Sequence, residues 1–197
     1  MIVGLTGSSG SGKSTVAKVF QGNGFHHIDC DEISRNVTGA GSDCLNEITL
    51  NFGDGILLPD GMLNRHALGE IVFRDAQKLK LLNEITHKYI LKAVEDIISE
   101  SESDVLIDAP LLFEADLDKR CDINIGVIAD RSIQIKRIAL RDGISEDTAA
   151  QRLAKQHDNG FFIKNCDYCI ENNGLESELI KNTEELILKL ERNRLND

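Results

Sequence analysis

A short glycine-rich segment, residues 7–14, restricts the possible folds of this chain more than any other feature. It reads Gly-Ser-Ser-Gly-Ser-Gly-Lys-Ser, which is the spacing GxxxxGK followed by Ser or Thr. The apolar run of residues 2–5 precedes it, and residues 13–21 have the composition of a helix. Consecutive backbone N–H groups in such a turn converge on one anion, and the positive end of the helix dipole points to the same place. The segment therefore predicts a strand, a phosphate-binding loop and a helix, in that order.

The residue types in this loop predict the phosphates of ATP as its ligand. Lys13 would reach the terminal phosphates as a point charge, and Ser14 would offer its hydroxyl to Mg²⁺. The residues that we expect to bind ATP here are Gly10, Ser11, Gly12, Lys13, Ser14 and Thr15. A small-residue loop in front of a capped helix is the structural alternative, and the spacing together with the Lys-Ser pair argues against it.

Composition limits the other partners of the chain. Its 197 residues suit one α/β domain with insertions or two small domains, and its net charge of −11 argues against nucleic-acid binding. We expect no targeting peptide, and no stretch approaches the ~18 apolar residues of a membrane span. Five scattered cysteines in a nucleotide-binding protein favour reduced thiols and a cytoplasmic location. The oligomeric state is not indicated.

Strand and helix signals alternate along the chain. Apolar runs typical of buried parallel strands lie at residues 2–5, 25–28, 105–107 and 123–128, with a weaker one at 168–170. They predict an α/β fold with a five-stranded parallel sheet and a functional site at the carboxyl ends of its strands. The long stretch between the second and third runs is expected to be helical, with one apolar stripe that includes Leu79 and Val94. Cys166 and Cys169 fall in the last expected strand, where residues three apart should point to opposite faces.

Acidic residues follow two of the expected strands. Asp31 could hold Mg²⁺ through water or accept the proton of a hydroxyl that attacks the γ-phosphate, and Arg35 would lie on the same side of a helix. Asp108 stands where an oxygen ligand for Mg²⁺, direct or through water, is needed. Capping of a helix is the alternative for Asp31 and Asp108, and Asp29 could serve as a cap instead of Asp31.

Two further segments suit a nucleotide. Basic residues concentrate between residues 131 and 156, which is typical of a lid that closes over phosphates, and we favour Arg141 among them; a solvated helix is the alternative. The turn of Asn172, Asn173 and Gly174 could reach the adenine edge, unless it is an ordinary turn.

Taken together, these elements resemble the dephospho-coenzyme A kinase family over essentially the whole chain. The matching pieces, in the family's order, are residues 5–15, 28–31 with Arg35, 60–65, His87, 108–114, Arg137 with 141–142, Arg152 with Gln156, and 167–174. The phosphate loop is shared with many kinases, whereas the pieces around Asp31, Arg65 and Asp108 in this order are far more specific.

The resemblance implies ATP-dependent phosphorylation of the ribose 3′-hydroxyl of dephospho-CoA to give coenzyme A. It implies Asp31 as general base, Arg35, Arg65 and His87 as substrate-binding residues, and Arg141 in a lid over ATP. It also implies a P-loop kinase core with helical CoA and lid domains. We therefore predict a nucleotide-binding core of residues 1–34, 104–140 and 165–197, a helical substrate-binding insertion of residues 35–103, and a lid of residues 141–164.

The chain departs from the family pattern at three positions. Lys88 replaces the usual Pro after His87, Cys30 replaces an Ala, and Phe162 stands where the family has a basic residue, with Lys164 as a candidate substitute. Another small P-loop kinase, acting on a nucleoside or a nucleoside monophosphate, remains the alternative function. A GTPase switch would need an NKxD element, which this sequence lacks, and a pure ATP-binding scaffold would bind ATP without transferring its phosphate.

Overall fold

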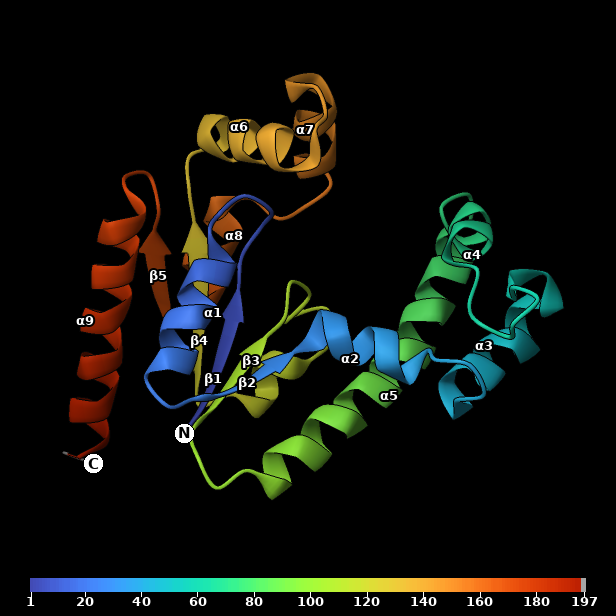
Figure 1. Cartoon of the computed structure of the whole chain (residues 1–197), viewed down its shortest axis with the longest axis horizontal. Helices are drawn as coiled ribbons and strands as arrows, with labels where there is room; N and C mark the ends of the chain where they lie inside the picture. The colour runs from blue at the N-terminus through green and yellow to red at the C-terminus, as the bar shows by residue number, and fades with distance from the viewer. Residues whose placement is uncertain (196–197) are drawn as a thin grey trace. The chain divides into compact units, whose positions relative to one another are not determined.

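The computed structural model describes residues 1–195 and divides into two compact units (Figure 1). The first unit comprises Met1–Ile28 and Ser101–Asp197, and the second comprises Asp29–Glu100. The second unit is therefore an insertion between two strands of the first. No helix in the described part of the chain has the length and apolar character needed to cross a membrane.

A parallel sheet forms the centre of the first unit, as the sequence predicted. Within the described residues its five strands are β1 (Ile2–Thr6), β2 (His26–Asp29), β3 (Val105–Asp108), β4 (Ile123–Ile128) and β5 (Tyr168–Glu171), in the order β2-β3-β1-β4-β5. The pairs β1–β3, β1–β4 and β4–β5 are parallel. The central strand β1 is apolar on both faces because both faces are covered, and its Val3 and Leu5 are fully buried.

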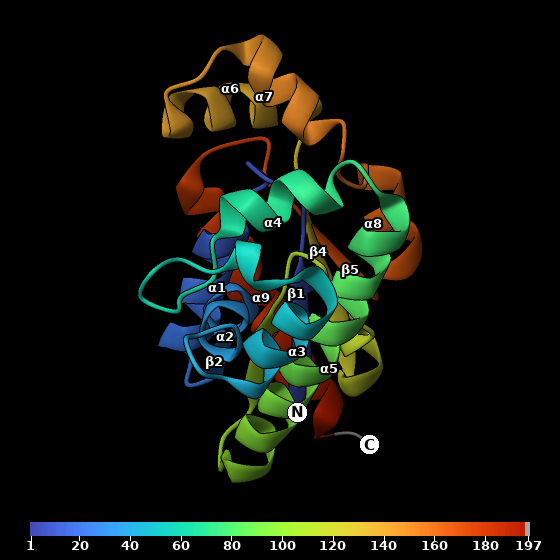
Figure 2. The ribbon, with the colours of Figure 1, turned by 90° about the vertical axis from the view of Figure 1, so that its right-hand side faces the viewer.

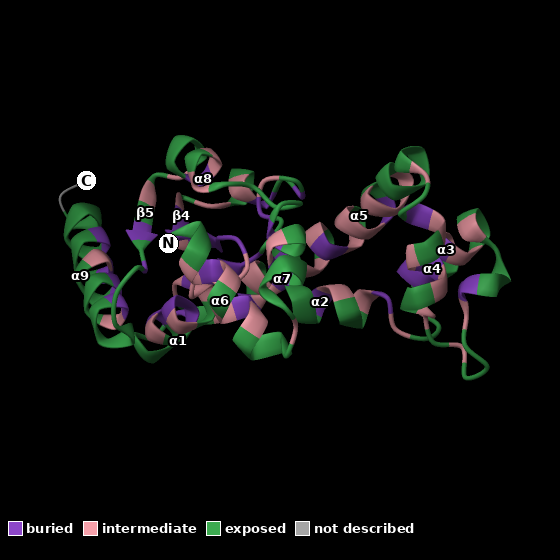
Figure 3. Cartoon of the chain, turned by 90° about the horizontal axis from the view of Figure 1, so that it is seen from above, coloured by how far each residue is buried: buried purple, intermediate pink, exposed green. Residues whose placement is uncertain are grey.

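Helices cover both faces of this sheet. On one face α1 (Lys13–Gly22) and α9 (Glu176–Arg194) pack through Phe20 and Ile187 against strand residues such as Ile125. Side chains alternate along a strand, so the neighbouring Gly126 faces the other side, where α8 (Asn159–Asn165) lies. Figure 2 shows α1 and α8 on opposite sides of the strands, and in Figure 3 buried and exposed residues alternate along α9, as expected of a helix with one packed face.

The close approach of α8 depends on the absence of a side chain at Gly126. A Cβ atom there would lie 3.1 Å from the Cβ atom of Phe162. Phe162, which we expected to stand in place of a basic residue, is buried in the core, whereas Lys164 on the same helix is exposed.

The described part of the first unit has two further α-helices and one short 3₁₀ helix. The 3₁₀ helix η2 (Leu117–Arg120) precedes β4, and α6 (Arg131–Asp142) and α7 (Glu146–Leu153) follow it. α6 and α7 pack together through Ile138, Ala149 and Leu153. Gly143, at a φ of 64°, ends α6 in the left-handed conformation, and the Ser145 side chain caps α7 by accepting a hydrogen bond from the Thr148 N–H.

The second unit is helical, as predicted. It consists of α2 (Cys30–Val37), α3 (Asp43–Phe52), η1 (Asp54–Ile56), α4 (Arg65–Val72) and the long α5 (Ala76–Glu100). Its core contains Ile48, Ile56, Leu68 and Ile85. The single apolar stripe predicted for α5 is confirmed only in part: Val94 is buried, but Leu79 is exposed, and the buried Ile85 and Ile90 lie outside the predicted stripe. α5 contacts α2, α3 and α4, so its apolar residues spread over more than one face.

The departure at Lys88 has a structural consequence inside this unit. The Lys88 ammonium and the Tyr89 hydroxyl both donate to Glu47 Oε2, at 2.6 and 2.7 Å, and so connect α5 to α3. The hydrogen bond from Lys88, with that from Tyr89, lowers the pKa of the Glu47 carboxyl. A proline at position 88 would remove one helical N–H and kink the chain, whereas with lysine α5 continues without interruption.

Truncation of Ile48 to alanine should destabilise the second unit by about 3 kcal/mol, because a fully buried side chain would leave a cavity. Leu50→Ala on the same helix is the matched control, since Leu50 is 86% exposed and its loss should cost less than about 0.5 kcal/mol. Urea unfolding followed by circular dichroism measures both. Equal losses for the two variants would contradict the assigned packing of α3.

Candidate functional site

The loop between β1 and α1 has the geometry of an anion-binding nest. Gly10 and Gly12 adopt φ values of 76° and 100°, where side-chain-bearing residues are strained. Gly12 is the N-cap of α1, and no side chain caps this helix. Among the described residues, the N–H groups of Gly10, Gly12, Lys13 and Ser14 have no hydrogen-bond partner. Four open amides at the positive end of a helix form a site for phosphate oxygens.

The carbonyl groups of the same loop are paired. Gln134 Nε2 donates to Ser9 O at 3.2 Å, and Arg137 NH1 donates to Gly10 O at 3.2 Å. Asn172 Nδ2 donates to Ser11 O at 2.7 Å. These donors come from α6 and from the turn after β5, so distant segments fix the conformation that leaves the amides open.

Asn172 links this network together. It is 6% exposed, its Oδ1 accepts from Arg137 NH2 at 3.2 Å, and its backbone carbonyl accepts from Arg137 NH1. Both ends of its side-chain amide are thus used inside the protein. Asn173 and Gly174, the other residues of the predicted adenine turn, are exposed, and Asn173 Oδ1 accepts from the Asp130 N–H at 2.7 Å.

Lys13 and Asp108, which the sequence placed at two different strand ends, are brought together. The Lys13 ammonium forms an ion pair with Asp108 Oδ1. His27, on β2, has its Nε2 3.4 Å from Asp108 Oδ2. The Asp108 carboxylate is nearly buried, so these two contacts replace water around it.

The segment after α7 also contacts the loop. Gln156 Oε1 accepts from the Ser9 N–H at 2.8 Å, and Gln156 Nε2 donates to Ser9 Oγ at 3.1 Å. The next residue, His157, stacks on Phe161 at 3.6 Å between ring centroids and has its Nε2 2.9 Å from Glu114 Oε1. Residues 156 and 157 therefore attach the predicted lid to the phosphate loop and to the segment after β3.

Arg141 is exposed and pairs with its neighbour. Its Nε and NH2 atoms donate to the two oxygens of Asp142, at 2.7 and 3.2 Å, and Arg152 NH1 donates to Asp142 Oδ2 at 3.1 Å. The hydrogen bonds from Arg141 lower the pKa of the Asp142 carboxyl. One carboxylate thus pairs with two guanidinium groups, so the three groups together carry one net positive charge.

The residues predicted to contact the substrate that receives the phosphate belong to the second unit. Asp29 Oδ1 caps α2 by accepting from the N–H groups of Asp31 and Glu32, at 2.8 and 3.1 Å. The Asp31 residue is exposed, and its carboxylate has no hydrogen-bond partner among the described residues. The cap that was an alternative for Asp31 is therefore supplied by Asp29.

Two arginines of the second unit contact its backbone or its buried side chains. Arg35 Nε donates to the Asp31 carbonyl at 3.1 Å. Arg65 NH2 donates to the buried Thr38 hydroxyl at 2.9 Å, which connects the start of α4 to the end of α2. His87 lies on α5 and is half-buried.

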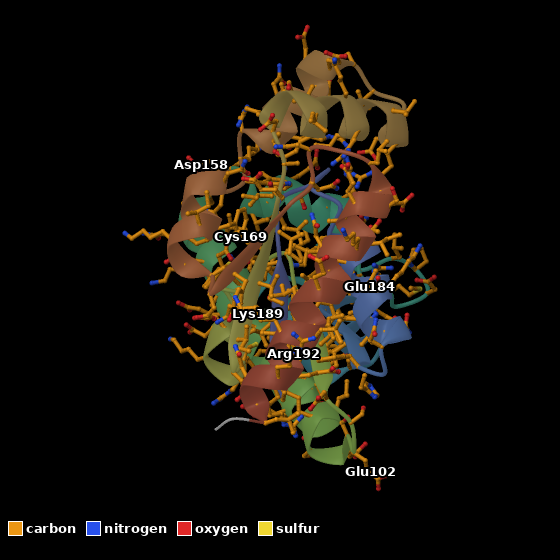
Figure 4. All side chains as sticks on the ribbon, turned by 90° about the vertical axis from the view of Figure 1, so that its left-hand side faces the viewer. Glu102, Asp158, Cys169, Glu184, Lys189 and Arg192 are labelled. Atoms are coloured by element: carbon orange, nitrogen blue, oxygen red, sulfur yellow. The ribbon has the colours of Figure 1, made fainter. Side chains whose placement is uncertain are left out.

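The cysteine pair differs from the prediction. Cys166 is the C-cap of α8 and precedes β5. Cys169 lies on β5 and is labelled in Figure 4. A Cβ atom on Gly126 would be 3.1 Å from Cys166 Sγ and 3.4 Å from Cys169 Sγ, so both sulfurs face the same side of the sheet. The expectation of opposite faces was wrong because only one of the two residues is in the strand. Burial raises the pKa of the Cys166 thiol to about 12, which makes it a poor nucleophile.

Sequence reasoning passed over Gln134 and His27. Gln134 is 3% exposed, and besides Ser9 O it donates to Ser8 Oγ at 2.8 Å. A polar residue on the buried face of a helix is the signal that could have found it. His27 had no comparable signal, because its partner is 81 residues away in the sequence.

The chain is similar to known proteins both in sequence and in fold. A family model described as dephospho-CoA kinase matches residues 1–178. The dephospho-CoA kinase of Listeria monocytogenes serotype 4b is 37% identical over 94% of this chain and 93% of the relative. Among solved structures, TT1252 from Thermus thermophilus has a TM-score of 0.82 at 28% identity, with coverage of 96% and 97%. The dephospho-CoA kinase from Campylobacter jejuni has a TM-score of 0.72 at 25% identity and covers 98% of each chain.

Gly12→Ala should weaken ATP binding at least about tenfold, because position 12 would be strained and its Cβ would lie 2.2 Å from Asn172 Nδ2. Gly22→Ala, at the other end of α1, is the control: a Cβ atom there meets nothing within 4 Å, and ATP affinity should be unchanged within about twofold. Titration calorimetry measures both. Normal ATP affinity of Gly12→Ala would show that this loop does not hold the phosphates.

Proposed function

The chain belongs to the dephospho-CoA kinase family, and from this we propose how its residues transfer the γ-phosphoryl group of ATP to the ribose 3′-hydroxyl of dephospho-CoA. The observation that carries the proposal is the set of open amides before α1, with Lys13 beside them and the loop carbonyls already paired. Such a loop binds phosphate without having to reorganise, and pre-oriented donors are the main source of catalysis in phosphoryl transfer.

In this proposal the amides of Gly10, Gly12, Lys13 and Ser14 bind phosphate oxygens of ATP. The Lys13 ammonium moves from Asp108 to the β- and γ-phosphates. Ser11 and Thr15, the other two residues predicted to bind ATP, stabilise this loop, since their N–H groups donate to Ser8 O and Gly12 O. The turn of residues 172–174 lies near the adenine, with Asn173 and Gly174 as its exposed members and the Asn172 side chain supporting the loop.

The residues beside the loop fit a magnesium ion. The Ser14 hydroxyl is exposed and without a partner among the described residues, and Asp108 supplies a carboxylate; hard oxygen donors of this kind suit Mg²⁺. No cluster of three or more His, Cys, Asp or Glu that could hold a metal occurs in the described part of the chain, so phosphate and water would complete the coordination. When bound, Mg²⁺ neutralises charge on the phosphates.

The acceptor is activated by Asp31 in this proposal. Its carboxylate is not engaged elsewhere because Asp29 caps the helix, and it accepts the proton of the acceptor hydroxyl as that oxygen attacks the γ-phosphorus. ADP is the leaving group. Arg141, held with Arg152 on Asp142, would neutralise negative charge on the transferred group.

The second unit binds dephospho-CoA in this proposal, with Arg35, Arg65 and His87 as its contacts. Two guanidinium groups and an imidazole suit the phosphate groups of such a substrate. The reaction takes place in the cytoplasm, where ATP is available and thiols stay reduced; none of the five cysteines forms a disulfide in the described part of the chain.

The activity is tested by ADP formation over a panel of acceptors with ATP and Mg²⁺. We expect saturable ADP release with dephospho-CoA and none above background with nucleosides or nucleoside monophosphates. Mass spectrometry of the product should show one added phosphate, on the ribose. Turnover with nucleosides alone would favour the alternative kinase, and ATP binding without ADP release in any mixture would favour a scaffold.

Asp31→Asn should lower kcat between about 10²- and 10⁴-fold, because the amide cannot accept the proton, while ATP affinity stays within a few-fold. Glu32→Gln is the control: it removes the neighbouring exposed carboxylate of the same helix turn and should leave kcat within about twofold. Steady-state kinetics and calorimetry give the two quantities. Near-normal turnover by the Asp31 variant would remove this residue from the role of base.

A further inference from the structure

The carboxylate of Asp108 is shared by two donors from different parts of the first unit. Lys13 pairs with Oδ1, and His27 Nε2 lies 3.4 Å from Oδ2. The three side chains are 18%, 10% and 22% exposed in the order Lys13, Asp108 and His27, so water contributes little to this cluster. Within the described residues no other side chain donates to this carboxylate.

The chemistry of the contact assigns the proton. An ionised carboxylate only accepts hydrogen bonds, so the His27 ring must carry its proton on Nε2 to bond with Asp108. The neutral ring is sufficient for this. His26 precedes it on β2, where alternate residues point to opposite faces, and His26 is exposed.

Binding of ATP changes the situation of Asp108. If Lys13 moves to the phosphates while no metal ion is present, Oδ1 loses its partner and the carboxylate stays buried. A buried carboxylate without a hydrogen-bond donor raises the free energy of the ATP complex, and this would weaken ATP binding. The partner that remains in place is His27, which β2 holds independently of the loop.

We infer that His27 is a positioning residue that keeps the Asp108 carboxylate hydrogen-bonded and in place when Lys13 leaves it for the phosphates of ATP. The inference rests on the phosphate-binding role proposed for Lys13. It explains how Lys13 can pair with the buried Asp108 before ATP binds and still leave it afterwards. When Lys13 leaves, the Asp108 carboxylate keeps one of its two hydrogen-bond donors, His27.

The test measures ATP binding by calorimetry in EDTA, so that no metal ion can replace the missing donor. His27→Leu and His27→Val should each raise the Kd for ATP about tenfold, the effect of one unsatisfied buried acceptor. His27→Gln retains an N–H donor and should stay within about threefold of the wild type. His26→Leu, next to it on the same strand, is the control and should bind ATP normally; thermal unfolding shows that each variant is folded.

The second arm distinguishes positioning from simple packing. In the Asp108→Asn background no buried charge needs a donor, so His27→Leu should change the Kd for ATP less than about twofold. An equal loss in both backgrounds, or no loss in the wild-type background, would overturn the inference. If the effect of His27→Leu on the Kd for ATP does not depend on Asp108, while dephospho-CoA is turned over normally, only the role of His27 is refuted. If dephospho-CoA fails as the acceptor, but His27→Leu still weakens ATP binding only when Asp108 is present, only the proposed reaction is refuted.

Discussion

The hydrogen bonds that hold the carbonyl groups of the phosphate loop are the interaction on which the rest of the first unit depends. A chain with a net charge of −11 has to concentrate positive potential at one point to bind an anionic nucleotide. Oriented amides do this without adding charge, provided that their carbonyl partners are satisfied elsewhere. Gln134, Arg137 and Asn172 meet that condition from three positions far along the chain.

The two basic side chains that we assign to phosphate binding are each paired with a carboxylate. Lys13 rests on Asp108, and Arg141 rests on Asp142, so neither cation is free in solvent. In each pair the carboxylate neutralises the cation until the phosphate groups of the nucleotide replace it. The pairs differ in burial: Asp108 is nearly enclosed, whereas the Arg141 side chain is 62% exposed, so only the first needs a second donor to stay stable when it is vacated.

The sequence predicted the features that arise from local pattern. The loop spacing, the five strands and the helical second unit follow from glycine positions, apolar runs and periodicity, and the structure confirms them. It did not predict the pairing of Lys13 with His27 through Asp108, or the common face of Cys166 and Cys169. These depend on which strands become neighbours and on where α8 ends, and neither is encoded in a short window. The buried face of α5 was predicted only in part for the same reason, since its partners come from three other helices.

The cap on α2 has a consequence for the robustness of the protein. Asp29 and Asp31 are chemically equivalent and two positions apart, yet only the first is occupied by backbone amides. If Asp29 were lost, the N–H groups of Asp31 and Glu32 would lose their acceptor, and the start of the helix that carries the Asp31 carboxylate would be less firmly fixed. With Asp29 as the cap, the Asp31 side chain stays available for the role that we propose for it, and a change at Asp29 would reach that role through the backbone of α2.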